Sequence, residues 1–152
     1  MGSVEGIYLA HAEGAETDAV ERVRVVAGRG PEGDRHYRAE GTEPSEPGMG
    51  SDLTLIEAEA VEGLRRDTGI ELAPGEHLRN VVTRGVALGE LVGRPFRVGG
   101  VRCVGIEPCD PSRRLELLTK PGVLKGLAGR GGLRADVVSG GEIAIGDPVE
   151  PL

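Results

Sequence analysis

The sequence is poor in aromatic residues, and its net charge has the wrong sign for binding nucleic acids. Among 152 residues the aromatic side chains are Tyr8, Tyr37 and Phe96, too few to stack a series of bases. The formal net charge is −7, whereas a general nucleic-acid binder presents a basic face. We therefore expect no nucleic-acid partner.

Long apolar runs are also lacking, and cysteines are few. No stretch approaches the ~20 apolar residues that a membrane-spanning helix needs, and the N-terminus lacks the charged-then-apolar pattern of a signal peptide. The two cysteines, Cys103 and Cys109, make no disulfide framework, and a disulfide between them is not expected in a reducing compartment. These absences favour a soluble, cytoplasmic protein without a membrane partner.

Glycine, in contrast, is abundant. The 26 glycines alternate with short runs of valine, leucine and isoleucine, which is typical of a turn-rich β fold, and the length fits one domain over residues 1–152. Strands are predicted at 3–10, 20–26, 53–56 and 78–83, with hairpins at 96–103 and 137–145. Helices are predicted at 57–68, 111–118 and 123–127. We expect a mainly β (α+β) fold, a barrel with two or three short helices around it.

One segment has the composition of a loop without fixed structure. Residues 39–51 are acidic and rich in proline, glycine and serine, and they contain no apolar pattern. The sequence therefore predicts a mobile loop here, within the single domain.

The first candidate binding segment is Gly33-Asp34-Arg35-His36. Glycine lets backbone N–H groups approach an anion, and Arg35 adds a two-pronged donor for phosphate or carboxylate, with His36 beside it. The alternative is a solvated loop in which Asp34 and Arg35 form a surface ion pair of little energetic value.

Two further arginine-containing segments are candidates. Arg79 and Thr83 share one face of the predicted strand and could hold an anionic or heterocyclic ligand, whereas Asn80 lies on the other face and could fix a neighbouring loop. Arg130 and Arg134 flank a glycine pair, which either closes over the same ligand or forms a tight turn into the last hairpin.

The most suggestive segment is Cys109-Asp110-Pro111-Ser112-Arg113-Arg114. Pro111 suits the first position of a helix, with Asp110 or Cys109 at the cap, and a cysteine at such a place beside arginines is favoured as a thiolate. A thiolate can act as a nucleophile, a sulfur carrier or a ligand of a soft metal. The alternative is a small apolar plug, which is what we expect of Cys103 on its alternating strand.

In their order and spacing these segments resemble the MOSC domain, named for the C-terminal domain of molybdenum cofactor sulfurases. The chain is most similar to the short, stand-alone bacterial members, and the matching segments are Gly33–His36, Arg79–Gly85, Leu88–Gly99, Cys109–Glu116, Arg130–Val137 and Gly141–Val149. The resemblance implies a barrel-like β domain that handles sulfur or the molybdenum cofactor. Relatives accompany a cysteine desulfurase domain, or bind molybdopterin in enzymes that reduce N-hydroxylated compounds, where a cysteine of the domain ligates the metal.

The sequence departs from this family at one important position. Short members commonly read Cys-x-Pro-Cys-x-x-Leu, and here Ser112 stands in place of the second cysteine. Serine is a poor ligand for a soft metal and cannot carry persulfide sulfur. Either Cys109 has taken over the catalytic or metal-binding role, or the chain has lost thiol chemistry and keeps a binding pocket.

Three functional hypotheses follow. The first is a sulfur carrier or molybdenum-cofactor-binding protein, with Cys109 holding sulfur or metal and the ligand bound by Arg35, His36, Arg79, Asn80, Thr83, Arg113, Arg130 and Arg134. The second is a non-catalytic module for a small anion or phosphorylated metabolite. The third is a molybdopterin-dependent reductase. The expected partners are a small anionic ligand and a cysteine desulfurase or redox protein. Pyridoxal phosphate fits poorly, because Lys120 and Lys125, the only lysines, fall in the outer helical region.

Overall fold

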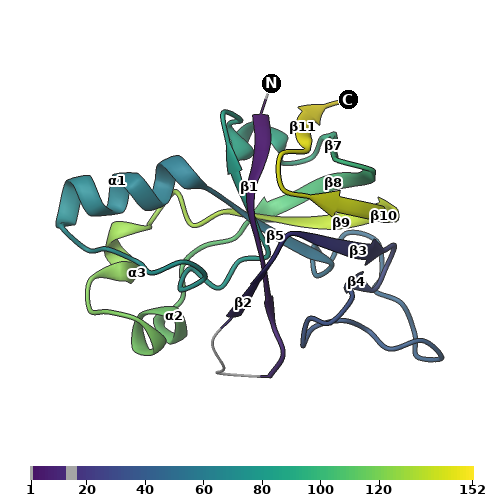
Figure 1. Ribbon diagram of the computed structural model, residues 1–152, viewed down its shortest axis with the longest axis horizontal. Helices are drawn as coiled ribbons and strands as arrows, with labels where there is room; N and C mark the ends of the chain where they lie inside the picture. The colour runs from purple at the N-terminus through teal and green to yellow at the C-terminus, as the bar shows by residue number, and fades with distance from the viewer. Residues whose placement is uncertain (1, 13–16) are drawn as a thin grey trace.

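A computed structural model describes residues 2–12 and 17–152 of the chain (Figure 1). In this part of the chain, strands close a barrel, and three α-helices gather at one side of it. The order around the barrel is β11 (Pro148–Pro151), β7 (Pro95–Val98), β8 (Val101–Pro108), β9 (Leu133–Ser139), β5 (Leu53–Glu57), β6 (Val81–Arg84) and β1 (Gly2–Ala10). The predicted fold class, mainly β with two or three short peripheral helices, is confirmed.

The ring closes because the first barrel strand pairs with the last, with Gly2 opposite Val149. Its neighbouring strands are antiparallel, except that β5 and β6 are parallel. A parallel pair needs a crossover connection, and α1 (Ala58–Thr68) supplies it between β5 and β6. Outside the ring, β2 (Thr17–Val20) pairs with β1, and β10 (Gly141–Ala144), β3 (Arg22–Val26) and β4 (Gly30–Pro31) form a second sheet.

The barrel interior is built from the alternating apolar residues of the strands. Val4, Ile7 and Leu9 of β1 are buried in one cluster that also contains Phe96 and Cys103. Burial raises the pKa of the Cys103 thiol to about 12, because an apolar interior disfavours the thiolate. The prediction that Cys103 belongs to the core is confirmed, and both cysteines are free thiols.

The helical side has a core of its own. The predicted helix 57–68 is observed as Ala58–Thr68, and it ends as expected at Gly69, whose φ of 77° lets its N–H reach the carbonyl of Arg65. Two short helices, α2 (Arg113–Leu118) and α3 (Val123–Gly126), lie beside α1. The apolar residues packed between these elements are Leu64, Leu72, Leu115, Val123 and Leu127. A 3-10 turn, η1 (Leu88–Leu91), precedes β7.

Two predicted strand arrangements are wrong. The predicted hairpin at 137–145 does not form, because β9 pairs with β8 and β5 while β10 pairs with β3 of the second sheet. The chain changes sheets at Gly140, where a Cβ would stand 2.6 Å from the carbonyl oxygen of Val25. The predicted strand 78–83 begins only at Val81, because Leu78 has a φ of 61° and belongs to a turn.

The acidic loop 39–51 is tied to the barrel at several points. The guanidinium of Arg29 donates to the carbonyls of Ala39 and Thr42, and the N–H groups of Gly48 and Gly50 donate to the carboxylate of Asp136. Its mobility stays a prediction. Among the described residues, no helix is long and apolar enough to cross a membrane.

Candidate functional site

The first component of the site is a buried arginine that holds three segments together. Arg79 exposes 8 % of its surface. Its Nε donates to the carbonyl of Gly131 at 2.9 Å, and its Nη1 donates to the carbonyl of His77 at 3.3 Å. Its Nη2 donates to the carbonyls of Cys109 and Asp110, at 3.1 and 3.3 Å. All three nitrogens therefore bind backbone oxygens, so Arg79 organises the loops of the site.

Cys109 lies on one of the loops that this arginine fixes. Its side chain exposes 4 % of its surface, yet it belongs to none of the three apolar clusters of the described residues. Its N–H donates to the carbonyl of Gly132 at 2.8 Å. Cys109 is therefore buried outside the three apolar clusters, on a loop whose backbone is bound by Arg79.

The glycine pair Gly131-Gly132 makes this close packing possible. A Cβ on Gly131 would stand 2.5 Å from the carbonyl oxygen of Cys109, and one on Gly132 would stand 2.1 Å from the carbonyl oxygen of Leu55. Gly132 also has a φ of 122°, which favours glycine. The pair is thus the place where the loop of Cys109 and the start of β9 touch.

A small pocket with cationic walls opens next to these loops. It has a volume of about 60 Å³ and is lined by Arg35, His36 and Arg114 together with Ala10, Ala12, Leu78 and Leu118. We call it the cationic pocket. Since a cavity holds one water when this volume reaches ~10–15 Å³, the pocket has room for a small oxyanion group.

The charges around this pocket act on one another. The pKa of His36 is lowered first by its partial burial and then by Arg35, Arg114 and Arg134, while Asp34 opposes them. Burial also lowers the pKa of Arg79, with Arg134 acting in the same direction and Cys109 and Asp110 in the other. Arg134 thus acts on both His36 and Arg79.

The segment 33–36 is shaped by a buried carboxylate. Asp34 accepts hydrogen bonds from the N–H of Ala10 at 3.0 Å and from the N–H of His36 at 3.2 Å. The amide Nδ2 of Asn80 donates to the same carboxylate at 3.4 Å, while its Oδ1 accepts from the N–H and hydroxyl of Thr54. Asp34 is therefore a buried carboxylate that fixes the loop. Asn80 joins this loop to β5, which is one of its two predicted roles.

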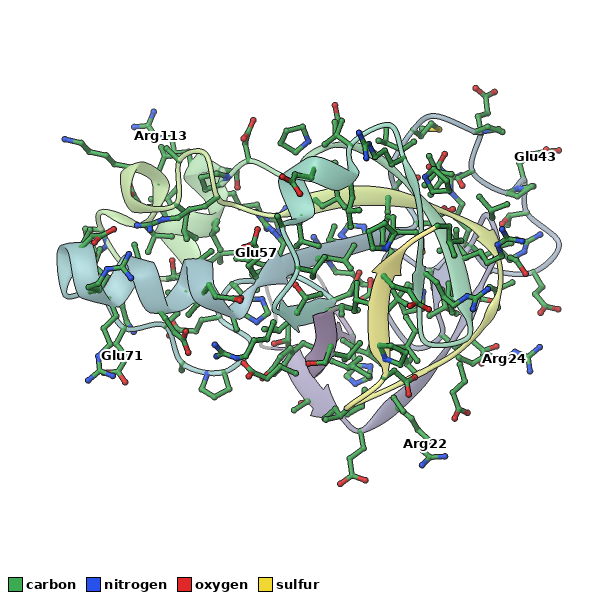
Figure 2. All side chains as sticks on the ribbon, turned by 90° about the horizontal axis from the view of Figure 1, so that it is seen from above. Arg22, Arg24, Glu43, Glu57, Glu71 and Arg113 are labelled. Atoms are coloured by element: carbon green, nitrogen blue, oxygen red, sulfur yellow. The ribbon has the colours of Figure 1, made fainter. Side chains whose placement is uncertain are left out.

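Several predicted site residues lie away from the cationic pocket. Arg113 is exposed on the outer side of α2 and points away from the molecule (Figure 2). Arg130 turns toward α1, where its Nη2 donates to Asp67 at 3.1 Å and its Nε to the carbonyl of Gly126. Thr83 is fully buried, and since Val82 faces α1, Thr83 faces the barrel interior. Of the predicted residues, Arg35 and His36 line the cationic pocket, and Arg79 binds the loop of Cys109. Arg134 acts on both His36 and Arg79, whereas Arg113, Arg130 and Thr83 lie outside both groups.

Ser112 has a structural task at the helix start. Its hydroxyl accepts a hydrogen bond from the N–H of Leu115 at 3.0 Å, so Ser112 is the N-cap of α2. The prediction of Pro111 as the first helical residue, with Asp110 or Cys109 as the cap, is therefore wrong. The side chain of Ser112 is exposed, three residues from the covered thiol.

Sequence reasoning missed Arg114 and His77. A helix that starts at Arg113 separates the directions of Arg113 and Arg114 by about 100°, so only one of them can face the pocket. His77 gave no such signal, because its partner is the backbone N–H of Arg79, 2.9 Å from its Nδ1.

The two lysines lie in the outer helical region. Lys120 contacts the carbonyl of Glu71 and the carboxylate of Glu76, and Lys125 is exposed on α3. Neither lines the cationic pocket. Among the described residues, no group of three or more His, Cys, Asp or Glu side chains is placed to hold a metal ion.

Solved structures with the same fold come from several bacteria. A YUAD protein from Bacillus subtilis superposes with a TM-score of 0.76 at 17% identity, covering 99% of this chain and 96% of that one. YiiM from Geobacillus stearothermophilus gives 0.72 at 14% identity, covering 100% and 75%. YiiM from Escherichia coli gives 0.68 at 18% identity, covering 99% and 69%. At these identities the likeness concerns the fold.

The sequence comparisons are more specific. A search of curated proteins finds no match. The model of the MOSC domain matches residues 36–150, which include the cationic pocket from His36 onward, Cys109 and all of the barrel strands except β1 and the last residue of β11. The chain belongs to the MOSC domain family.

Proposed function

We propose that this chain binds the molybdenum cofactor, or a similar phosphate-bearing ligand, with its anionic group in the cationic pocket and Cys109 as the thiol beside it. The observation that carries the proposal is the convergence of Arg35, His36 and Arg114 on one pocket, with Arg134 near enough to act on His36. Paired guanidinium donors suit phosphate, because they offer several N–H groups in a fixed plane.

The residues present fit such a group in their chemistry. A phosphate requires cations and N–H donors, which the pocket supplies. A soft metal or sulfur atom requires a sulfur ligand, and Cys109, on the loop that Arg79 binds, would provide it. Arg79 keeps the loop of Cys109 in place, and Asp34 fixes the loop of Arg35 and His36. When bound, the cofactor would supply redox or sulfur chemistry, and the chain would bind and orient it.

In the sulfur-carrier form of this proposal, a cysteine desulfurase is the donor. The Cys109 thiolate would attack the outer sulfur of the persulfide on the desulfurase, forming a new S–S bond on Cys109 while the desulfurase cysteine leaves as a thiolate. This exchange needs no external oxidant. Because Cys109 exposes 4 % of its surface, the loop 109–112 must open before the desulfurase can reach the thiol. The desulfurase would bind at this loop, and the exchange would take place in the cytoplasm.

A second candidate function is supported by a different observation. The hydroxyl of Ser112 caps α2, and the thiol of Cys109 is nearly covered, so the site would work as an anion-binding module without thiol chemistry. This function needs the cationic pocket alone. The two proposals differ only in whether Cys109 matters.

The anion site is tested by titrating the protein with inorganic phosphate at constant ionic strength. A charge-assisted hydrogen bond is worth ~1.5–3 kcal/mol, so Arg114→Gln should weaken phosphate binding about tenfold or more. Arg113→Gln is the matched control, because it removes the same charge one residue away on the outer side of α2. Equal weakening in both variants would show a general charge effect and would refute the pocket.

The thiol is tested separately. Incubation with a cysteine desulfurase and cysteine, followed by intact-mass measurement, should give a persulfide adduct that Cys109→Ser lacks. Molybdenum content after expression in a host that makes the cofactor should fall in the same variant. If Cys109→Ser changes neither adduct, metal content nor phosphate affinity, the non-thiol function is the correct one.

A further inference from the structure

A second hollow lies on the outer face of the barrel wall, away from the cationic pocket. It has a volume of about 210 Å³ and is bounded by β1, β6, α1 and the turn 72–77. Its floor is mostly apolar, with Val61, Leu72, Pro74 and Val82 among its lining residues. It shares no lining residue with the cationic pocket.

One wall of this hollow carries a buried polar group with an unused donor. His77 exposes 4 % of its surface, and burial holds its pKa at about 4, so the ring is neutral. Its Nδ1 accepts from the N–H of Arg79 at 2.9 Å, which places the proton on Nε2. Among the described residues, Nε2–H has no hydrogen-bond acceptor, and since it is not one of the buried atoms without a partner, it reaches the solvent of the hollow. The Tyr8 ring stands edge-on to it, with 5.0 Å between the ring centroids.

The charged side chains at the rim of the hollow are paired with one another. The guanidinium of Arg84 bridges the carboxylates of Glu5 and Glu62, with contacts of 2.6 Å to each. These hydrogen bonds lower the pKa of Glu62, which stays ionised, so the rim holds two negative charges and one positive charge. An anionic ligand would be repelled by this rim, and a cationic one would have to compete with Arg84.

From these three features we infer that the hollow is a binding site for a small uncharged molecule with an apolar body and one hydrogen-bond acceptor, such as a carbonyl or hydroxyl oxygen, that binds His77 Nε2–H. A closed cavity of 150 Å³ is enough to bind benzene, so about 210 Å³ suits a single substituted ring or a branched chain of similar size. An acceptor is needed because a ligand that fills the hollow displaces water from Nε2–H, and a donor buried in this way without a partner carries a desolvation cost that a ligand oxygen removes.

The probe for this site is benzamide, whose ring and amide oxygen match the two requirements, with toluene as the matched molecule that lacks the acceptor. Binding is followed by NMR on the Nε2 signal of His77 and on the methyl groups of Val61 and Val82. The other histidines, His11 and His36, serve as internal controls, since neither lines this hollow. We expect saturable shifts at His77, and benzamide should bind about three- to tenfold more tightly than toluene.

Two variants separate the pocket from the donor. Val61→Trp fills the hollow from α1 and should abolish binding, whereas Arg65→Trp, at an exposed position one turn further along the helix, should leave it intact. His77→Asn offers an oxygen to the Arg79 N–H but has no Nε2–H, so it should remove the preference for benzamide over toluene while keeping the fold. The proposal is overturned if no shift saturates, if toluene binds as tightly as benzamide to the wild type, or if Val61→Trp still binds.

Discussion

Arg79 provides the most direct test of how this site is held together. In Arg79→Met an uncharged chain of similar shape replaces the guanidinium, and four backbone carbonyls lose their donor. The bonds to Gly131 and Cys109, at 2.9 and 3.1 Å, are the shortest, and at ~1–2 kcal/mol each their loss amounts to roughly 2–4 kcal/mol. The loss of the two bonds at 3.3 Å is offset because Arg79→Met no longer buries a charge. The cost of burying this charge is what lowers the pKa of Arg79.

The expected result is a large fall in stability with a local consequence. For a chain of this length, 1 kcal/mol corresponds to roughly 2–4 °C, so thermal unfolding of Arg79→Met should move down by about 5–15 °C. Arg79→Lys keeps the charge but not the planar arrangement of donors, and should lose more than half as much. Thiol labelling followed by peptide mass analysis should show that Cys109 reacts faster in both variants.

The matched control is Arg113→Met, which removes an exposed guanidinium from the outer side of α2. Its unfolding free energy should change by less than ~0.5 kcal/mol. A change in melting temperature below ~2 °C for Arg79→Met, or an equal change for Arg113→Met, would refute the role of Arg79 as the clamp of this site.

Three other predictions follow from single contacts. Ser112→Ala removes the cap that accepts from the Leu115 N–H, and urea unfolding should show a loss of ~1 kcal/mol that Ser112→Asp largely avoids. The His77 pKa of about 4 lies below its unfolded value near 6.5. His77 therefore contributes stability that is complete above pH 6.5 and is lost as the pH falls toward 4, by about 3 kcal/mol in total. His77→Asn should flatten this part of the stability–pH curve, and an unchanged curve would contradict the assignment. With a pKa of about 12, Cys103 should resist alkylation at pH 8 in the folded protein, whereas rapid labelling there would mean that the barrel interior opens.

The local signals in the sequence were sufficient for most strands and for α1. The apolar alternation of β1 and the Gly99-Gly100 turn between β7 and β8 depend on neighbours in the chain, and the structure has both. The hairpin predicted at 137–145 failed because its register depends on a distant partner, β3, which competes successfully with β9 for β10. No pattern within residues 137–145 reports that competition.

The site was predictable in its chemistry and less so in its members. Arg35 and His36 line one pocket, and Arg79 binds the loop of Cys109. That all four residues belong to one site, as the order of motifs indicated, stays a prediction. The cap of α2 is Ser112, two residues after Asp110 and three after Cys109, so the helix begins later than expected. Arg130 pairs with Asp67 on α1. Burial also gave Arg79 backbone partners, which the one-dimensional sequence does not show.

The pairing of β1 with β11 has a consequence for how the molecule folds. Ser3 and Pro148 meet across the seam of the barrel, so this contact spans nearly the whole sequence. The entropy of closing so long a loop is compensated only after the intervening strands are in place, which makes the seam a late step in folding. On the ribosome the end of β1 at Gly2 and Ser3 must therefore wait for its partner until residues 148–151 have emerged, and an unpaired strand end of this kind is prone to aggregation.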